Sequence, residues 1–368
     1  MALVLDGLVK RFGKITALDG ISFGVERGSV FGFLGANGAG KTTTMRIVLD
    51  IIKPDAGTVT WNGVAAADAP RETWGYLPEE RGLYTRLEVL GQLVFFASLY
   101  GIPRDVATAR AREWLARFRI LDYESRRAEE LSKGNQQKVQ LIAAILHEPA
   151  VLIMDEPFVG LDPVNVALLK EAFEEMRTRG STLIFSTHQM DTVEELCDSV
   201  ALIDRGKLVL AGSIGEVKRS TGRRVVRLAV DAPGSDVNGA SGPGANGPGA
   251  SGPGASGPGA SGHGANGPGA NGPGAGRPDL GWIAELHGVR IARAGLDYTE
   301  LDIDRDVDPE SVLRAALDRG HRVTLFQIAE PSIESIFIER VGRAPSEDRH
   351  LATTASSEDA ATPAGAAS

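Results

Sequence analysis

The eight residues from Gly35 to Thr42 constrain the fold of this chain more than any other segment. They read Gly-Ala-Asn-Gly-Ala-Gly-Lys-Thr, after an apolar run and before a run with helical periodicity. This spacing fits the pattern G-x-x-x-x-G-K-[ST], in which glycines let backbone N–H groups close around a β-phosphate, and the next helix N-terminus adds positive potential. We therefore predict a phosphate-binding loop between a strand at Val30–Leu34 and a helix from Thr42. Lys41 would bridge β- and γ-phosphates, and the Thr42 hydroxyl would ligate Mg²⁺.

Two consecutive acids follow a second apolar strand. Residues 151–154 read Val-Leu-Ile-Met, and Asp155 and Glu156 come directly after them. A carboxylate at a strand tip is suited to hold Mg²⁺ through water, and its neighbour is suited to polarise an attacking water. The pattern assigns the first role to Asp155 and the second to Glu156.

Short apolar runs alternate with helix-period runs over residues 1–212, which predicts a largely parallel sheet covered by helices on both faces. The strand-like residues 3–5 and 21–25 are separated by a Gly/Asp turn and predict an antiparallel addition at the N-terminus. After residue 215 the pattern changes to that of an α+β module over residues 216–343. We expect its strands at 223–230, within 288–303 and at 322–328, and its helices at 309–319 and 331–341.

A repetitive segment interrupts this module. Of the 45 glycines in the chain, sixteen lie between Gly239 and Gly276, where units such as Ser-Gly-Pro-Gly-Ala and Asn-Gly-Pro-Gly-Ala repeat. A period of five residues excludes a collagen helix, which needs glycine at every third position. We predict a flexible linker at 232–278 and, from the small polar residues at the C-terminus, a disordered tail at 344–368.

Charge and composition exclude several classes of protein. The formal net charge of −9 argues against a nucleic-acid partner held by a general basic surface, which needs clustered Lys and Arg. The single cysteine, Cys197, cannot form an intrachain disulfide, and the N-terminus lacks the layout of a signal peptide. No apolar run approaches the ~18 residues of a membrane span. We expect a cytosolic chain that meets a membrane only through a partner.

A family resemblance rests on residues 131–137, which read Leu-Ser-Lys-Gly-Asn-Gln-Gln at the start of a helical run. They resemble the LSGGQ signature of ABC-type ATPases. Phe12 resembles the aromatic residue that stacks on adenine, Asp162 the D-loop aspartate and His188 the switch histidine of that family. The resemblance covers about residues 1–215. In addition, residues 331–342 resemble the C-terminal accessory domain of ABC-2-type exporter ATPases, a group that includes sodium-efflux and drug-resistance subunits.

The resemblance implies an α/β fold. Residues 1–215 would form a P-loop NTPase cassette of the ABC type, with an antiparallel β subdomain and a helical subdomain, followed by the small α+β accessory domain. In this family ATP is hydrolysed between two cassettes packed head to tail, so that the signature of one faces the γ-phosphate held by the other. One chain has one phosphate loop and one signature, so two copies are needed.

The site residues implied by motif and resemblance fall into five groups. They are Phe12, Gly35, Asn37, Gly38, Gly40, Lys41, Thr42 and Thr43 for the nucleotide; Thr42, Asp155 and Glu79 for the metal; Glu156 and His188 for catalysis; Asp162 for the D-loop; and Ser132, Gly134 and Asn135 for the signature acting in trans.

Three positions in two motifs depart from the family pattern. Glu79 stands where relatives carry a metal-contacting glutamine. A carboxylate also ligates Mg²⁺, but it adds negative charge beside the γ-phosphate. In the signature, Lys133 and Asn135 replace the usual glycine and glutamine. A lysine is electrostatically acceptable beside a triphosphate, and asparagine keeps an amide.

Together these features favour an ATP-binding and ATP-hydrolysing subunit of an ABC transporter. Such a subunit would couple ATP-driven dimer closure to export through a separate membrane permease, at the cytoplasmic face of the membrane, with the permease contact around residues 87–99. Two alternatives stay open. One is an ATP-gated regulator with little hydrolysis, suggested by Glu79. The other is a soluble ABC-type factor not linked to transport, which the single cassette disfavours.

Overall fold

The computed structural model describes residues 2–80, 82–231, 280–295 and 297–342. They belong to two units. The cassette unit contains the residues up to Thr221 and those from Pro331 onward, and the accessory unit contains Gly222–Glu330. The predicted linker at 232–278 and the predicted tail at 344–368 lie outside the described residues.

The cassette unit is built around a six-stranded sheet with the strand order β10-β9-β3-β8-β7-β6. The strands are β3 (Val30–Leu34), β6 (Trp74–Leu77), β7 (Val151–Asp155), β8 (Thr182–Thr187), β9 (Ser199–Asp204) and β10 (Lys207–Ser213). Neighbouring strands are parallel except for β10, which runs antiparallel to β9. Every residue of β3, β7 and β8 is buried, as expected for parallel strands covered on both faces.

The register of this sheet brings three predicted elements to one edge. Leu34 at the end of β3 pairs with Thr187, and Asp155 at the end of β7 pairs with Ser186. The phosphate loop, the two acids and His188 therefore all leave the sheet at the carboxyl ends of adjacent strands. Ligands bind at this edge in open α/β sheets.

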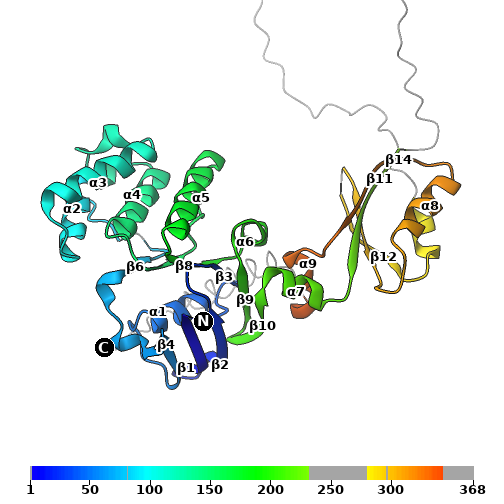
Figure 1. Ribbon diagram of the computed structural model, residues 1–368, viewed down its shortest axis with the longest axis horizontal. Coiled ribbons are helices and arrows are strands. Elements are labelled where there is room, and N and C mark those ends of the chain that lie inside the picture. The colour runs from blue at the N-terminus through cyan, green and yellow to red at the C-terminus, as the bar shows by residue number, and fades with distance from the viewer. Residues whose placement is uncertain (1, 81, 232–279, 296, 343–368) are drawn as a thin grey trace, which may run out of the picture. The chain divides into compact units, whose positions relative to one another are not determined.

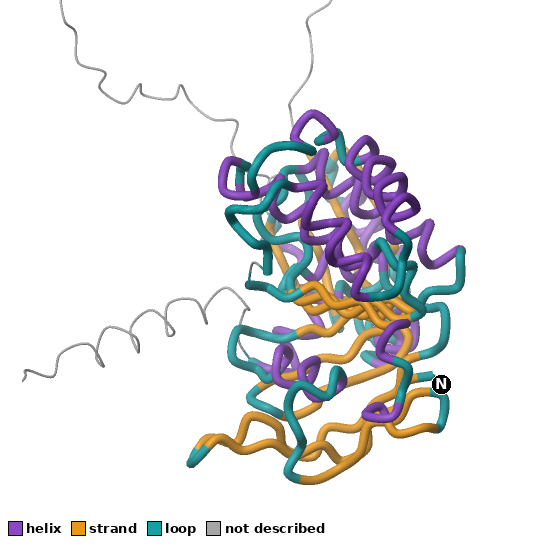
Figure 2. Tube along the Cα trace, turned by 90° about the vertical axis from the view of Figure 1, so that its left-hand side faces the viewer, coloured by secondary structure: helices purple, strands orange, loops and turns teal. Residues whose placement is uncertain are grey.

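A separate antiparallel sheet, ordered β2-β1-β4-β5, contains the predicted N-terminal addition. Its strands are β1 (Leu3–Phe12), β2 (Ile15–Val25), β4 (Ala56–Trp61) and β5 (Val64–Ala65). Leu8 and Leu18 from this sheet share a buried cluster with Phe33 of β3 and Met45 of the first helix. Figure 2 shows this sheet on the side of the cassette unit opposite most of its helices.

The helices of the cassette unit are α1 (Lys41–Val48), α2 (Val89–Leu99), α3 (Arg104–Arg117), α4 (Lys133–Ile145), α5 (Pro163–Thr178), α6 (Met190–Leu196), α7 (Ile214–Ser220) and α9 (Ile333–Val341). Helices α2 to α5 gather into a helical subdomain (Figure 1). Short 3₁₀ turns lie at Ala66–Asp68, Arg71–Thr73, Leu121–Tyr123 and Ala128–Glu130.

The accessory unit is an antiparallel sheet with one helix, ordered β12-β13-β11-β14. It consists of β11 (Arg224–Asp231), a 3₁₀ turn at Gly281–Glu285, β12 (Val289–Ala294), β13 (Thr299–Ile303), α8 (Glu310–Asp318) and β14 (Arg322–Ala329). Its core contains Val226 of β11, Leu301 of β13 and Val312 of α8. The predicted α+β character of this region is observed.

The unit boundaries differ from the predicted division at residue 215. Helix α7 and helix α9, both assigned to the accessory domain by their sequence position, pack in the cassette unit. The reason is burial, because Val217, Ile333 and Phe337 lie in the same apolar cluster as Val193 of α6. The backbone N–H of Ile333 also donates a hydrogen bond to the Glu194 carboxylate of α6. The C-terminal helix therefore returns to the cassette after the accessory sheet is complete.

Candidate nucleotide-binding site

The phosphate loop enters α1 through a glycine that leaves the helix without a side-chain cap. Gly40, the N-cap residue, has a φ of 111°. A Cβ at this position would lie 2.7 Å from the carbonyl oxygen of Ala17. The turn therefore requires glycine for its backbone conformation and for its packing. The first N–H groups of α1 receive no side-chain acceptor from the N-cap, and such groups form an anion site.

A cavity of about 210 Å³ opens at this helix N-terminus. It is lined by Ala17, Ala36, Asn37, Gly38, Gly40, Lys41, Thr42, Thr43, Glu79, Asp155 and Glu156. These residues come from the loop between β3 and α1, the segment after β6 and the end of β7. The structure thus brings together nearly all of the predicted phosphate- and metal-site residues, and Gly35 contacts Lys41 through its carbonyl oxygen.

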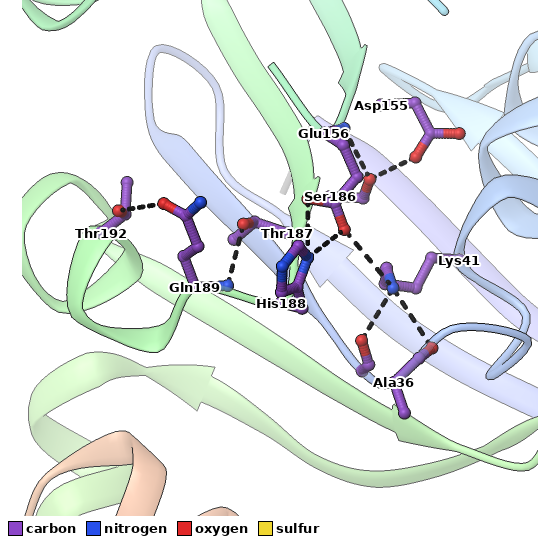
Figure 3. A network of polar contacts seen from close by, with 10 residues as sticks. Ala36, Lys41, Asp155, Glu156, Ser186, Thr187, His188, Gln189 and Thr192 are labelled. Carbon is purple, nitrogen blue, oxygen red and sulfur yellow. Dashed lines mark hydrogen bonds and ion pairs between the residues drawn. The ribbon is translucent and has the colours of Figure 1, made fainter. Parts of the chain in front are cut away.

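Lys41 is held inside this cavity by backbone carbonyl groups (Figure 3). Only 6% of its surface is exposed. Its Nζ donates to the carbonyl oxygens of Gly35 at 2.7 Å and Ala36 at 3.2 Å, and it lies 3.8 Å from Oε1 of Glu156. Burial lowers the pKa of Lys41, while the negative charges of Glu156, Asp155 and Glu79 oppose that shift. Lys41 is therefore the cation set against three carboxylates of the cavity lining.

The ends of β7 and β8 fix the two acids relative to each other. The Ser186 hydroxyl donates to a carboxylate oxygen of Asp155, and the Ser186 Oγ accepts a hydrogen bond from the Glu156 N–H at 3.1 Å. Nδ1 of His188 lies 3.0 and 3.1 Å from the two carboxylate oxygens of Glu156. Figure 3 shows Glu156 between His188 and Lys41. Glu156 has a φ of 50°, an uncommon conformation for a residue other than glycine, so its neighbours hold it in a strained position.

Glu79 adds a third carboxylate to the cavity. Partial burial raises its pKa first, and the charges of Asp155 and Glu156 raise it further, while Lys41 acts in the opposite direction. A negative charge at Glu79 is therefore disfavoured where the lining contains only protein atoms. A cation bound among these oxygens would reverse that balance.

Known proteins resemble the chain over most of its length. Residues 18–159 match the family model described as ABC transporter, and residues 276–341 match the model described as ATP-binding protein DrrA1-3-like, C-terminal domain. The uncharacterized ABC transporter ATP-binding protein YhaQ of Bacillus subtilis is 36% identical over 340 residues, which cover 92% of this chain and 98% of that protein. The chain belongs to the ABC transporter ATP-binding proteins.

Further relatives of this ABC protein carry names from resistance systems. The linearmycin resistance ATP-binding protein LnrL of Bacillus subtilis is 33% identical over 62% of this chain and 75% of that protein. The daunorubicin resistance ATP-binding protein DrrA3 of Streptomyces coeruleorubidus is 35% identical over 60% of this chain and 71% of that protein. A solved structure of an ATP-binding subunit of an ABC transporter is 32% identical, with a TM-score of 0.57 over 60% of this chain and 94% of that chain.

These findings confirm the predicted family, the cassette fold and the ATPase assignment. The protein is an ATP-binding, ATP-hydrolysing subunit of an ABC transporter, and the two alternative functions are not favoured. Subunits of this family work with transmembrane permease partners. Among the residues that the structure describes, no helix combines the length and the apolar character needed to cross a membrane.

Magnesium fits the donor atoms of this ATPase cavity. Asp155 is 1% exposed, and its Oδ2 has no hydrogen-bond partner among the described residues. The Thr42 hydroxyl and the Glu79 carboxylate line the same cavity. Mg²⁺ is usually bound by one or two protein carboxylates together with phosphate oxygens and water. The buried, unpartnered oxygen of Asp155 therefore has a chemical explanation in a bound cation.

Several predicted residues of the ABC protein lie outside the cavity lining. Phe12, at the end of β1, is 47% exposed, with Nζ of Lys10 at 5.5 Å from its ring centroid. Ser132 caps α4 by accepting a hydrogen bond from the Asn135 N–H at 3.3 Å, with Gly134 in the same turn. Asp162 caps α5 by accepting one from the Asn165 N–H at 3.0 Å. A single chain does not bring Phe12, the signature or Asp162 into the lining of the phosphate cavity.

Two contributors to the site were not predicted from the sequence. Ser186 bonds both Asp155 and the Glu156 backbone, and Gln140 of α4 donates to the carbonyl groups on either side of Glu79. Ser186 stands at the end of an apolar run and Gln140 between Val139 and Leu141, where a polar side chain signals a buried hydrogen bond. The partner of that bond comes from another element, so the signal alone does not reveal it.

Proposed function

We propose that two copies of this chain close head to tail around ATP and that this closure drives export through a separate membrane permease. The observation that supports the proposal is the division of the site within one chain. Glu156 lies beside Lys41 in the cavity, whereas the capped N-terminus of α4 at Ser132 contributes nothing to the lining. A second copy would supply the Ser132 hydroxyl and the Gly134 N–H to the γ-phosphate, with Asn135 in the same turn.

Hydrolysis in such a dimer depends on positioning and charge neutralisation. The N–H groups at the start of α1 would receive the β-phosphate, and Lys41 would exchange its carbonyl partners for phosphate oxygens. Glu156 would orient or deprotonate the attacking water, and His188, within hydrogen-bond distance of Glu156, would contact the γ-phosphate. Bound Mg²⁺, held by Thr42, Asp155 and Glu79, would neutralise phosphate charge. Phe12 would stack on adenine, and Asp162 would connect the two sites.

The permease would contact the helical subdomain. A groove of about 620 Å³ is lined by residues of α2 and α3, including Val94 and Phe95, together with charged side chains such as Arg112 and Glu124. Phe95 is 44% exposed and packs edge to face with Tyr84. An open groove with apolar and charged walls suits a helical segment of a partner protein. This surface supports the expected contact around residues 87–99 and a peripheral position at the cytoplasmic face of the membrane.

The substitution Glu156→Gln tests the dimer. It keeps the shape of the side chain and removes the base, so ATP should bind without being hydrolysed. We expect turnover to fall by at least about 100-fold and the protein to elute as a dimer in gel filtration with Mg²⁺ and ATP. Glu72→Gln is the control, because Glu72 is exposed and does not line the cavity. A Glu156→Gln protein that stays monomeric with ATP would exclude the sandwich for this chain.

A further inference from the structure

We propose that Gln140 is a positioning residue that holds Glu79 at the nucleotide cavity and links it mechanically to α4, the helix that begins after Ser132. The inference rests on the proposed function, because only in a two-chain site does the N-terminus of α4 respond to the partner's nucleotide.

The contacts of Gln140 are unusual for a residue inside a helix. It lies on the inner side of α4, with 5% of its surface exposed. Its Nε2 donates to the carbonyl oxygen of Pro78 at 3.1 Å and to that of Glu80 at 3.0 Å. These are the two carbonyl groups that flank Glu79, so one amide group fixes the backbone on both sides of that residue. Both N–H donors of the amide are thereby used.

The oxygen atom of the Gln140 amide indicates that this side chain acts through its N–H donors. Oε1 of Gln140 is buried and has no hydrogen-bond partner among the described residues. A buried acceptor without a partner is destabilising. An apolar side chain would avoid this cost and would lose the two bonds to the Glu79 segment. The arrangement makes sense if the position of Glu79 matters more than the local stability of α4.

Glu79 needs such a restraint because its surroundings repel it. Residues 78–80 form neither helix nor strand, and Glu79 is itself exposed on one side. Two further carboxylates, those of Asp155 and Glu156, line the same cavity, and like charges repel one another. A free loop would relieve the repulsion by turning the side chain toward water. The two bonds from Gln140 keep the backbone in place, so that Glu79 stays in the lining before any cation binds.

The same bonds connect two places that act on different nucleotides. Ser132 and Gln140 are eight residues apart, which is about 12 Å along a helix. Helix α4 moves as a rigid element, so a displacement of its N-terminus by the partner's γ-phosphate is transmitted to Gln140 and then to the backbone at Glu79. Each chain would thus adjust its own metal ligand in response to the nucleotide of its partner.

The test measures Mg²⁺-dependent ATP turnover of the full chain. Gln140→Met keeps an unbranched side chain of similar volume and removes both donors. We expect about a tenfold lower kcat and about a fivefold higher Mg²⁺ concentration for half-maximal turnover. In a Glu79→Ala background, the same substitution should change either value by less than about twofold, since Gln140 acts through Glu79.

Gln92→Met is the matched control. Gln92 lies within the 87–99 segment proposed for the permease contact, but its side chain is fully buried and lines neither the nucleotide cavity nor the groove of the helical subdomain, and the turnover assay contains no permease. Its Oε1, like that of Gln140, has no hydrogen-bond partner among the described residues. This variant should retain the Mg²⁺ dependence of the wild type. Gln140→Asn, which keeps an amide and shortens its reach, provides a second variant if Gln140→Met does not fold. It should shift the Mg²⁺ requirement in the same direction.

Equal losses with and without Glu79 would overturn the inference, because Gln140 would then act through packing alone. An unchanged Mg²⁺ dependence in both Gln140 variants would overturn it as well. Different results would contradict the proposed function and the role of Gln140. A wild-type chain without Mg²⁺-ATP turnover contradicts the proposed function, whereas a wild-type chain with turnover and Gln140 variants that match it contradict only the role of Gln140.

Discussion

The N-termini of α1 and α4 are the two helix ends that we propose bind phosphate, and they differ in how much of the site their own chain supplies. Helix α1 starts after Gly40, which offers no side-chain cap, and its first residue, Lys41, is buried in a cavity with three carboxylates. Helix α4 starts after Ser132, whose hydroxyl already accepts the Asn135 N–H, and Ser132 is exposed. The first end is enclosed by its own chain, and the second faces outward.

The glycines at these two ends show the same difference. A Cβ on Gly40 would meet the Ala17 carbonyl oxygen at 2.7 Å, whereas the nearest atom to a Cβ on Gly134 is the Gly160 carbonyl oxygen at 3.8 Å. The chain itself therefore explains glycine at position 40 and leaves glycine at position 134 unexplained. Glycine inside a helix costs about 1 kcal/mol relative to alanine. A glycine at the start of α4 therefore fits the proposed contact with a second copy of the chain.

The largest expected effect concerns the enclosed end. Lys41→Ala removes the cation that faces the three carboxylates, so the cavity becomes strongly repulsive to a triphosphate. We expect ATP turnover to fall by at least about 100-fold, with weaker nucleotide binding in a fluorescence titration. Lys53→Ala is the control, because the Lys53 side chain is 71% exposed. Turnover within about tenfold of wild type would show that the α1 end is not the phosphate site.

Gly40→Ala tests whether the α1 end is shaped by its own chain. The positive φ and the contact with Ala17 predict a loss of about 2 kcal/mol in the free energy of unfolding. For a unit of this size the melting temperature should fall by roughly 4–8 °C without nucleotide. Calorimetry of the apo protein measures this. An unchanged melting temperature would remove the structural reason given for this glycine.

Gly134→Ala tests the opposite expectation at the α4 end. The fold should be as stable as wild type or more stable, by up to about 1 kcal/mol. ATP turnover should nevertheless fall about tenfold, which is ~1.4 kcal/mol in barrier, because a methyl group would separate the helix end from the partner's phosphate. In a Glu156→Gln background, the ATP-dependent dimer should weaken in gel filtration.

Gly91→Ala is the control for helix propensity in the purified ATPase. Gly91 also lies in a helix, α2, and a Cβ there would be 4.0 Å from its nearest neighbour, the Cβ of Glu88. It should gain similar stability and keep full turnover. If Gly134→Ala also keeps full turnover, the outward-facing end has no role in hydrolysis and the comparison between the two helix ends fails.

Glu79→Gln should have the smallest effect. The amide is the ligand implied by the family resemblance, so Mg²⁺-dependent turnover should stay within about tenfold of wild type.

The pKa of Glu79 is raised in the folded protein, so the stability linked to its protonation is present below the unfolded pKa of about 4.5 and is lost as the pH rises through the folded value. The variant should therefore melt slightly higher than wild type at pH 7, and the difference should vanish near pH 4. A melting-temperature difference that stays constant from pH 7 to pH 4 would show that the charge of Glu79 is not its cause.

Much of the cassette could be predicted from local sequence. The buried runs at Val30–Leu34, in β7 and in β8 are continuous and apolar, and they became adjacent parallel strands. The residues of the phosphate loop and the pair Asp155 and Glu156 were found because each motif is contiguous and lies at a strand end. The boundary of the accessory domain was harder to predict. Helix α9 has an ordinary amphipathic pattern that does not say which core it enters.

Contacts between segments far apart in the chain could not be predicted from local sequence patterns. Gln140 meets the carbonyl groups of Pro78 and Glu80 across about 60 residues of sequence, and Ser186 meets Asp155 across 31. A polar residue beside apolar ones indicates that its side chain forms a buried hydrogen bond. Which partner it finds depends on strand order and helix placement, which no local pattern contains.

The sequence alone is enough to predict the chemistry that this protein has available: a loop of glycines with a lysine, a strand ending in two acids, and a motif that resembles the ABC signature. Their residue types and spacings are local, so they are readable along the chain. The tertiary structure decided which of them meet. The parallel register of β3, β7 and β8 places Lys41, Asp155, Glu156 and His188 at one sheet edge, while the start of α4 remains outside the cavity. Side-chain burial, charge repulsion at Glu79 and the bonds from Gln140 arise only when those elements pack, because each depends on atoms that are far apart in the chain.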